Sequence, residues 1–293
     1  MNTEKSRSSV VVALLDRTIS FLVETSLFIA IVGAIVLFFS FLLYAIPVDV
    51  RLLFASFLIV FSVYSIDKLD DMEEDAINVP DRARFATRHR HKIEAAVLIA
   101  VPAALLLAFS QSFYAMLVVS LPLVVGFLYS AGISAFRLKN VKHGEKSVVV
   151  ATTWALVATL LPLVVVPRGV LEILLVFWFF FVKCFVNTTL FDFRDIDGDV
   201  ATGVVTLPVY FGRSKTRSFL LFLNSSLVIW LGCSYLFGFF HKYLPLLVIF
   251  IAYGYWCILR ECNASSADRY VDLPVDGEWL LLAAATIPFI YFL

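Results

Sequence analysis

The chain has 293 residues, of which 61% are hydrophobic and only 16% are charged, and its mean hydropathy is +0.93. Lysine plus arginine and aspartate plus glutamate number 23 each, so the net charge gives no support for a nucleic-acid partner. Long apolar runs recur along the chain, which predicts an all-α, polytopic integral membrane protein. This composition excludes a separate soluble domain, and we expect one transmembrane domain over residues 1–293.

Nine apolar segments follow a short polar tail of about residues 1–17. They cover residues 18–46, 50–66, 93–109, 113–130, 147–166, 170–190, 217–240, 243–260 and 278–293. Most of them approach the roughly 20 residues that a helix needs to cross the hydrocarbon core of a bilayer. The sequence therefore predicts nine transmembrane helices.

The distribution of lysine and arginine predicts the orientation. If the N-terminus is cytoplasmic, that side carries 19 basic residues, whereas the opposite side carries only Arg51, Arg168 and Lys242. Basic loops are retained in the cytoplasm, so we predict a cytoplasmic N-terminal tail. Two acidic stretches then follow even-numbered segments and face the same side. We expect the helices to surround a central cavity that these stretches cap on the cytoplasmic side.

The first acidic stretch follows the second apolar segment. Asp67, Asp71 and Asp75 are spaced by four, and on a continued helix each carboxylate would lie about 6 Å beyond the last along one face. Asn78 and Arg82 follow. A lone acidic run is as often a solvated loop as a site. A second cluster on the same side favours a site.

The second stretch follows the sixth segment and contains Asp192, Asp195 and Asp199. Lys183 and Asn187 precede Asp195 and Asp199 on the same four-residue spacing, so they share one helix stripe. A lysine inside a span is costly unless it faces a cavity or a partner. We predict that Lys183 lines the pocket; the alternatives are snorkelling and an ion pair with a neighbouring helix.

Both stretches offer only oxygen donors, which suit a hard divalent ion such as Mg²⁺ shared between carboxylates and phosphates. Arg82 could add a bidentate contact to phosphate oxygens. Tyr129, Lys139 and Lys146 fit either phosphate binding or a basic loop beside anionic lipid headgroups. The acidic residues within 272–278 fit either an acceptor site or a solvated loop.

These motifs resemble those of the UbiA superfamily of intramembrane prenyltransferases. The family's NxxxDxxxD motif corresponds to Asp67, Asp71 and Asp75, and its Asn-x-Pro-x-Arg continuation to Asn78, Pro80 and Arg82. The family's DxxDxxxD motif corresponds to Asp192, Asp195 and Asp199, and the tail of that motif to Gly203 to Val209. The family's Tyr/Lys region between the two motifs corresponds to Tyr129, Lys139 and Lys146. Two departures concern the acceptor more than the reaction: Asp67 replaces the leading asparagine, and Ala83 follows Arg82 where proline is common.

The resemblance implies that two Mg²⁺ ions bridge the aspartates to an isoprenyl diphosphate, whose prenyl group passes to a lipophilic or aromatic acceptor. It implies catalytic roles for Asp67, Asp71, Asp75, Asp195 and Asp199, metal ligation by these five and Asp192, and substrate binding by Asn78, Arg82, Tyr129, Lys139, Lys146, Lys183 and Asn187.

Two alternatives remain open at this point. A terpene cyclase of the same superfamily would capture the allylic cation with the substrate's own double bonds. A divalent-cation or organic-anion transporter is less favoured, because transporters place polar residues near the bilayer midplane, whereas here the charge gathers at one mouth.

Overall fold

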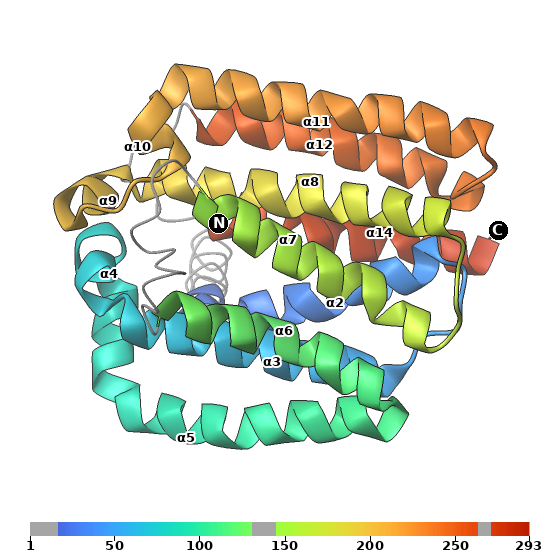
Figure 1. The fold of residues 1–293 in the computed structure, drawn as a ribbon. Coiled ribbons are helices and arrows are strands. Elements are labelled where there is room, and N and C mark those ends of the chain that lie inside the picture. The colour runs from blue at the N-terminus through green and yellow to red at the C-terminus, as the bar shows by residue number, and fades with distance from the viewer. Residues whose placement is uncertain (1–16, 131–144, 263–270, 293) are drawn as a thin grey trace, which may run out of the picture.

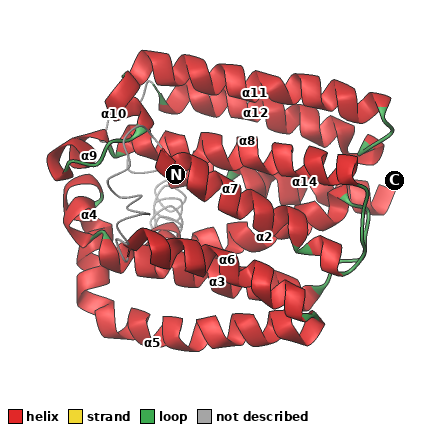
Figure 2. Cartoon of the chain, viewed as in Figure 1, coloured by secondary structure: helices red, strands yellow, loops and turns green. Residues whose placement is uncertain are grey.

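The computed structural model describes residues 17–130, 145–262 and 271–292, and all regular structure in these ranges is helical (Figure 2). The helices are α2 (Leu27–Leu43), α3 (Val50–Asp70), α4 (Met72–Asn78), α5 (Pro80–Gln111), α6 (Phe113–Ser130), α7 (Glu145–Leu160), α8 (Val170–Arg194), α9 (Ile196–Thr202), α10 (Leu207–Phe211), α11 (Arg213–Leu236), α12 (Leu244–Glu261), α13 (Asp272–Val275) and α14 (Glu278–Phe292), with short 3₁₀ turns at Pro162–Val164 and His241–Tyr243. A further helix, Arg17–Glu24, precedes α2 at an angle of 76°.

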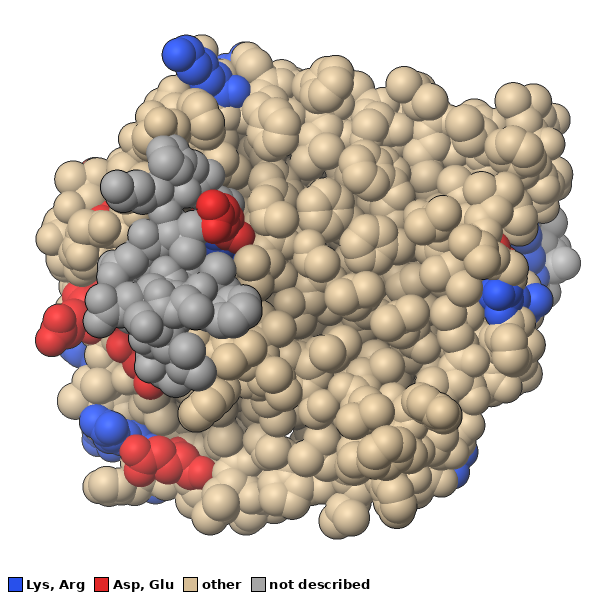
Figure 3. All heavy atoms as spheres, viewed as in Figure 1, with Lys and Arg blue, Asp and Glu red and all other residues tan. Residues whose placement is uncertain are grey.

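The long helices run roughly side by side, with α5 at one outer edge and the α11–α12 pair at the other (Figure 1). Helix α4 contacts α9, and both lie at one end of the bundle, beyond the ends of α3 and α8. Acidic side chains gather at that end, whereas the middle of the visible face carries almost no charge (Figure 3). An uncharged band between charged ends is the surface that a bilayer requires.

Six of the described helices are long and apolar enough to cross a membrane, or seven if Arg17–Glu24 and α2 form one bent span. All nine predicted apolar segments contain helix in the described residues, but the apolar part of α6 (Phe113–Leu128) and the 15-residue α14 are shorter than a full crossing. The prediction of an all-α, multi-pass architecture is therefore confirmed, with six or seven membrane-spanning helices in the described residues.

Each acidic stretch forms the same local structure, a long helix that bends at an aspartate and continues as a seven-residue helix. Helix α3 ends before Asp71 and α8 ends before Asp195, and these residues have similar backbone angles (φ −98°, ψ 22° and φ −91°, ψ 6°). The continued helix, on which the even spacing of the carboxylates along one face depended, is therefore interrupted at Asp71. Backbone bonds from Asp71 N to Asp67 O and from Asp75 N to Asp71 O (both 2.9 Å) nevertheless carry the helical register across the bend.

Local residues explain where the short helices end. Pro80 occupies the first turn of α5, where its missing N–H costs nothing, so α4 stops at Asn78 and a new helix begins. Gly203 ends α9 in the left-handed conformation (φ 77°), and the amide of Val204 returns to the carbonyl of Asp199 at 2.8 Å. These two turns keep both acidic stretches at the same end of the bundle.

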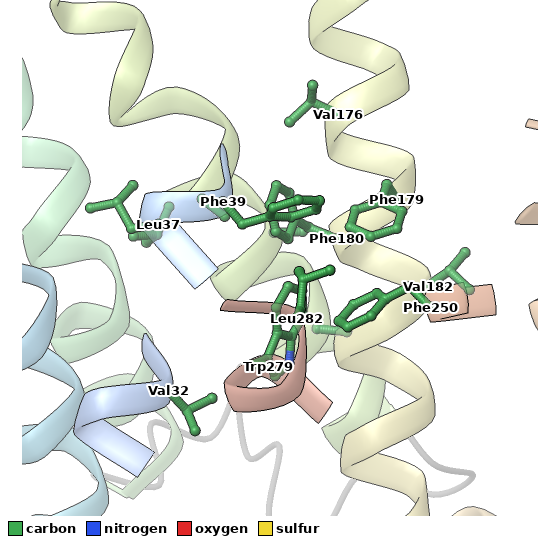
Figure 4. Packing of buried hydrophobic residues seen from close by; sticks show 14 of the residues in the cluster. Val32, Leu37, Phe39, Val176, Phe179, Phe180, Val182, Phe250, Trp279 and Leu282 are labelled. Carbon is green, nitrogen blue, oxygen red and sulfur yellow. The ribbon is translucent and has the colours of Figure 1, made fainter. Parts of the chain in front are cut away.

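An aromatic cluster joins four helices at the centre of the molecule (Figure 4). Phe39 of α2, Phe179 of α8, Phe250 of α12 and Trp279 of α14 are all buried, and the rings of Phe250 and Trp279 lie 4.9 Å apart between centroids. Such pairs add about 0.5–1.5 kcal/mol beyond their buried area. The cluster fixes α14 against α8.

Candidate active site

One cavity connects the acidic end of the bundle to its apolar interior. Its empty space, counted with the open mouth, is about 1710 Å³. The mouth is lined by charged residues from α3, α4, α5, α7 and α8, and the interior by apolar residues, including Val32, Val36, Leu37 and Val60. The cavity therefore offers one place for an ionic group and another for a hydrocarbon chain.

The first acidic stretch contributes all three predicted aspartates to the cavity wall. Asp67 is exposed to the cavity space, and Asp71 is half-buried. Asp75 is only 4% exposed and accepts two bonds from Arg82, which also lines the cavity, with Nε to Oδ2 at 2.6 Å. This is the bidentate geometry in which arginine binds carboxylate or phosphate most strongly.

The second stretch contributes Asp192 and Asp195. Ser147 of α7 donates to Asp192 Oδ2 at 2.9 Å, whereas Arg194 binds both oxygens of Asp195 at 2.7 and 2.8 Å. Five of the six predicted aspartates therefore line one cavity, and one aspartate from each stretch is already neutralised by an arginine.

Asp199 does not line this cavity and is 1% exposed. Thr206, in the turn after Gly203, donates to Asp199 Oδ2 at 2.8 Å. Burial, followed by a hydrogen bond with Glu74 of α4, raises the pKa of Asp199 to about 8. Since Glu74 itself lines the cavity, this bond connects Asp199 to the mouth and joins the two stretches.

Substrate binding by Asn78 stays a prediction; in the structure its side chain contacts α9. Asn78 is absent from the cavity wall, and its Oδ1 accepts a hydrogen bond from the backbone N–H of Gly198 at 2.9 Å. A methyl group at Gly198 would lie only 2.3–2.5 Å from the Asn78 amide. The two residues form a close contact between α4 and α9.

Lys183 was predicted to line the pocket, and the structure contradicts this. Its side chain is 1% exposed, it is absent from the cavity wall, and its Nζ lies 2.7 Å from Oε2 of Glu278 on α14. The ring of Phe250 lies 4.6 Å from Nζ. An ion pair with a neighbouring helix, the stated alternative, is what the structure contains, because α14 brings a carboxylate to this depth.

Asn187 lines the cavity, but its amide is used to hold the polypeptide before α14. Nδ2 donates to the carbonyl of Val275 at 3.1 Å and to Oε1 of Glu278 at 3.2 Å.

Lys146, half-buried on α7, lines the cavity and interacts electrostatically with Asp67 and Asp192. Lys139 lies outside the described residues; Tyr129 is in α6, but its side chain is not described.

Two functional candidates were missed by the sequence reasoning. Arg194 adjoins Asp195 and also approaches Asp272 at 3.6 Å. Lys68 is 5% exposed, lines the cavity, and donates to the carbonyls of Val23 (2.6 Å) and Glu24 (3.0 Å) at the end of the first helix. Both side chains sit next to an aspartate in the sequence, so the only signal was a basic residue inside an acidic motif.

The donor set fits a hard divalent cation in its chemistry, because carboxylate oxygens predominate and no histidine of the described residues lines the cavity. The sulfur of Cys184 also lines it, eight residues before Asp192 on α8. As the side chains lie, no three acidic, histidine or cysteine groups in the described ranges form a metal cluster. Asp75 and Asp195 are instead held by Arg82 and Arg194. Each carboxylate oxygen has a second lone pair, so these aspartates could bind a cation while the arginines stay in place.

Sequence comparison identifies this architecture. The profile of the UbiA prenyltransferase family matches residues 26–273 of the chain. The chain belongs to that family. This UbiA prenyltransferase is therefore a multi-pass membrane enzyme, as the motifs predicted. No curated protein shows significant sequence similarity to it.

Solved structures of three proteins share the fold. A UbiA homolog from Archaeoglobus fulgidus bound to DMAPP and Mg²⁺ superposes with a TM-score of 0.69 at 14% identity, over 93% of this chain and 99% of its own. The apo UbiA homolog from Aeropyrum pernix K1 gives 0.64 at 14% identity, over 87% and 98%. A digeranylgeranylglyceryl phosphate synthase gives 0.58 at 17% identity, over 94% and 98%. At these identities the likeness establishes the fold of this UbiA prenyltransferase.

Proposed function

We propose that this enzyme transfers a prenyl group from an isoprenyl diphosphate to a lipophilic or aromatic acceptor within the membrane. The observation that carries the proposal is the single cavity in which carboxylates and arginines at the mouth lead into an apolar interior. A prenyl diphosphate has the same two parts, a highly charged head and a hydrocarbon tail. The Archaeoglobus fulgidus homolog, which was solved with DMAPP and Mg²⁺ bound, supports this class of substrate and cofactor.

The proposed metal ligands are Asp67, Asp71, Asp75, Asp192 and Asp195, which all line the cavity, and Asp199 stays in the proposed set on the basis of its sequence motif alone. Two Mg²⁺ ions at these positions would neutralise the negative charge that builds on the departing diphosphate.

The cationic side chains would bind the diphosphate oxygens. Arg82 and Arg194 have the bidentate fork that suits phosphate, and Lys146 faces both acidic stretches. The apolar wall would exclude water from the reacting carbon. Tyr129 and Lys139 stay in the proposed binding set on sequence grounds alone.

We further propose nine crossings in a single domain, with the N-terminal tail, most of which lies outside the described residues, and the cavity mouth on the cytoplasmic side. The basis is the excess of lysine and arginine on that side, 19 against 3. Cysteine labelling from outside intact cells should modify a cysteine placed near Arg168 and leave one placed at Asp197 unmodified. The opposite pattern would refute the orientation.

The test of function uses the purified full chain with Mg²⁺ and DMAPP, and it measures diphosphate release. Asp71→Ala and Asp195→Ala should each abolish release, and chelation of Mg²⁺ should do the same. The matched control is Asp197→Asn, an exposed acid on α9 that does not line the cavity, and its rate should stay near that of the wild type. Release that persists in both alanine variants would refute the assignment.

A terpene cyclase remains the second candidate. The rings of Tyr64 and Trp154 stack on the cavity wall with centroids 6.1 Å apart, and aromatic faces can stabilise a carbocation. Incubation of a longer prenyl diphosphate without acceptor separates the two: a cyclic terpene favours the cyclase. The transporter alternative is set aside, because the chain belongs to a family of enzymes.

A further inference from the structure

A third acidic segment, outside both family motifs, reaches the cavity from the C-terminal part of the chain. Asp276 lies between α13 and α14, is 8% exposed, and lines the cavity together with Asp272 and Trp279. The amide of Asp276 bonds to the carbonyl of Asp272 at 3.0 Å, and the amide of Trp279 bonds to the carbonyl of Asp276 at 3.2 Å. The carboxyl group therefore sits on a hydrogen-bonded turn.

The turn is fixed from behind by α8. Asn187 donates to the carbonyl of Val275 and to Glu278, and Lys183 completes the attachment through its ion pair with Glu278. Asn187 also bonds to Asp276 itself. Burying a charged lysine in a membrane protein costs free energy, so such a residue usually has a structural or functional role. Here it holds the segment that delivers a carboxyl group to the cavity wall.

Asp276 faces a different part of the cavity from the motif aspartates. Its electrostatic neighbours are Tyr64 of α3, Cys184 and Arg194 of α8, and Asp272 and Glu278 of its own segment. Cys184 precedes Asp192 by eight residues, about 12 Å along α8 towards the interior. Asp276 thus spans the boundary between the ionic mouth and the apolar wall, where the reacting carbon of a bound prenyl diphosphate would lie.

Prenyl transfer releases a proton as well as diphosphate. The bond between the allylic carbon and the diphosphate oxygen breaks, and diphosphate keeps the electron pair. The acceptor then bonds to the allylic carbon and loses a proton, which a base must take. The motif aspartates are bound to arginine, to a hydrogen-bond donor or, in the proposed function, to Mg²⁺, so they are poorly placed to accept it.

We propose that Asp276 is the catalytic base that accepts the proton lost when the prenyl cation is captured by an acceptor bearing an O–H or an aromatic C–H. Burial, with Asp272 and Glu278 nearby, holds the pKa of Asp276 well above the ordinary range of a carboxyl group. A raised pKa makes its carboxylate a stronger proton acceptor. This inference rests on the proposed prenyl diphosphate chemistry and adds the residue that takes up the proton in the last step of the reaction.

The test needs no identified acceptor. Full-length protein receives Mg²⁺ and DMAPP labelled at C1, and two quantities are measured: the rate of diphosphate release and the ratio of C5 diene to C5 alcohol. The diene forms when a base removes a proton from the cation, whereas the alcohol forms by capture of water. Asp276→Asn should keep diphosphate release within about threefold of the wild type and lower the diene share at least tenfold.

Asp276→Glu retains a carboxylate and should recover part of the diene. The matched control is Asp197→Asn, an exposed acid on α9 that does not line the cavity, and it should leave the ratio unchanged. A second measurement needs no variant: the wild-type diene share should fall as the pH is lowered, because a protonated carboxyl group cannot accept a proton.

Equal losses of diene and alcohol in Asp276→Asn, a diene share that does not respond to pH, or a wild type that forms alcohol alone would each overturn the assignment of Asp276. A wild type that releases no diphosphate at all would instead refute the proposed function itself, so the two failures are distinguishable.

Discussion

The side-chain oxygen of Asn78 accepts a hydrogen bond from the backbone N–H of Gly198, and this bond, together with the one between Glu74 and Asp199, joins two acidic stretches across 120 residues of the chain. Asn78 is the last residue of α4, and Gly198 lies in the first turn of α9. Because each stretch supplies part of the cavity mouth, the separation of the two carboxylate sets depends on this contact.

The first prediction concerns that contact. In Gly198→Ala the new methyl group would overlap the Asn78 amide, so either that side chain moves and loses its bond to the Gly198 N–H, or α4 and α9 separate. We expect Mg²⁺-dependent diphosphate release to fall at least tenfold. Asn78→Ala leaves the buried N–H of Gly198 unpaired and should destabilise the fold by about 1–2 kcal/mol. The double variant removes the overlap, so its activity should exceed that of Gly198→Ala alone. Additive losses in kinetic and thermal unfolding assays would contradict the contact.

The second prediction concerns the buried ion pair. Lys183→Met leaves Glu278 without its partner in an apolar region, and loss of one member of such a pair costs about 3–5 kcal/mol. The double variant Lys183→Met with Glu278→Leu should recover most of that stability. Thermal unfolding in detergent measures both. The control is Glu94→Gln, which removes an exposed ion pair with Arg90 on α5 and should leave the midpoint unchanged.

The third prediction is a pH dependence in metal-free protein. Because the folded pKa of Asp199 is raised to about 8, folding favours its protonated form. The stabilisation is complete below the ordinary carboxyl range and is lost as the pH rises through 8. The unfolding temperature in chelator should therefore decrease between pH 5 and pH 9, and Asp199→Asn should flatten that slope. An identical slope in the variant would assign the effect to other groups.

The fourth prediction concerns Lys68. Its ammonium group binds the last carbonyls of helix Arg17–Glu24, where the helix dipole favours a cation. In Lys68→Met the helix loses this attachment, so the amides of residues 21–25 should exchange with deuterium at least tenfold faster, while those of α8 remain unchanged. Lys68→Arg keeps a cation and should stay close to the wild type. Unchanged exchange in Lys68→Met would show that the helix is held by other contacts.

The sequence was sufficient to predict that the chain is helical, crosses a membrane repeatedly and belongs to this family. Apolar length and the spacing of Asp67, Asp71, Asp192 and Asp195 carry that information directly. The bends at Asp71 and Asp195 were not predictable, because the helical register continues across them and no glycine or proline marks them.

The positions of Lys183 and Asn78 could not be derived from their own segments. Lys183 shares a helical stripe with Asp195, yet which neighbour it meets depends on how α14 packs, and the aromatic cluster decides that. Asn78 follows the first acidic stretch in the way expected of a substrate ligand, but its partner is a backbone amide in α9. Long-range packing, which a single sequence does not encode in a readable pattern, separates both side chains from the cavity.

The ion pair of Lys183 and Glu278 also constrains how the protein can be made. Translation delivers Lys183 to the translocon 95 residues before its carboxylate exists. Until then α8 carries an uncompensated charge that costs at least about 2.5 kcal/mol in the bilayer. The final helix therefore completes the insertion of a much earlier one, and a nascent chain that stops before residue 278 should be a target for membrane quality control.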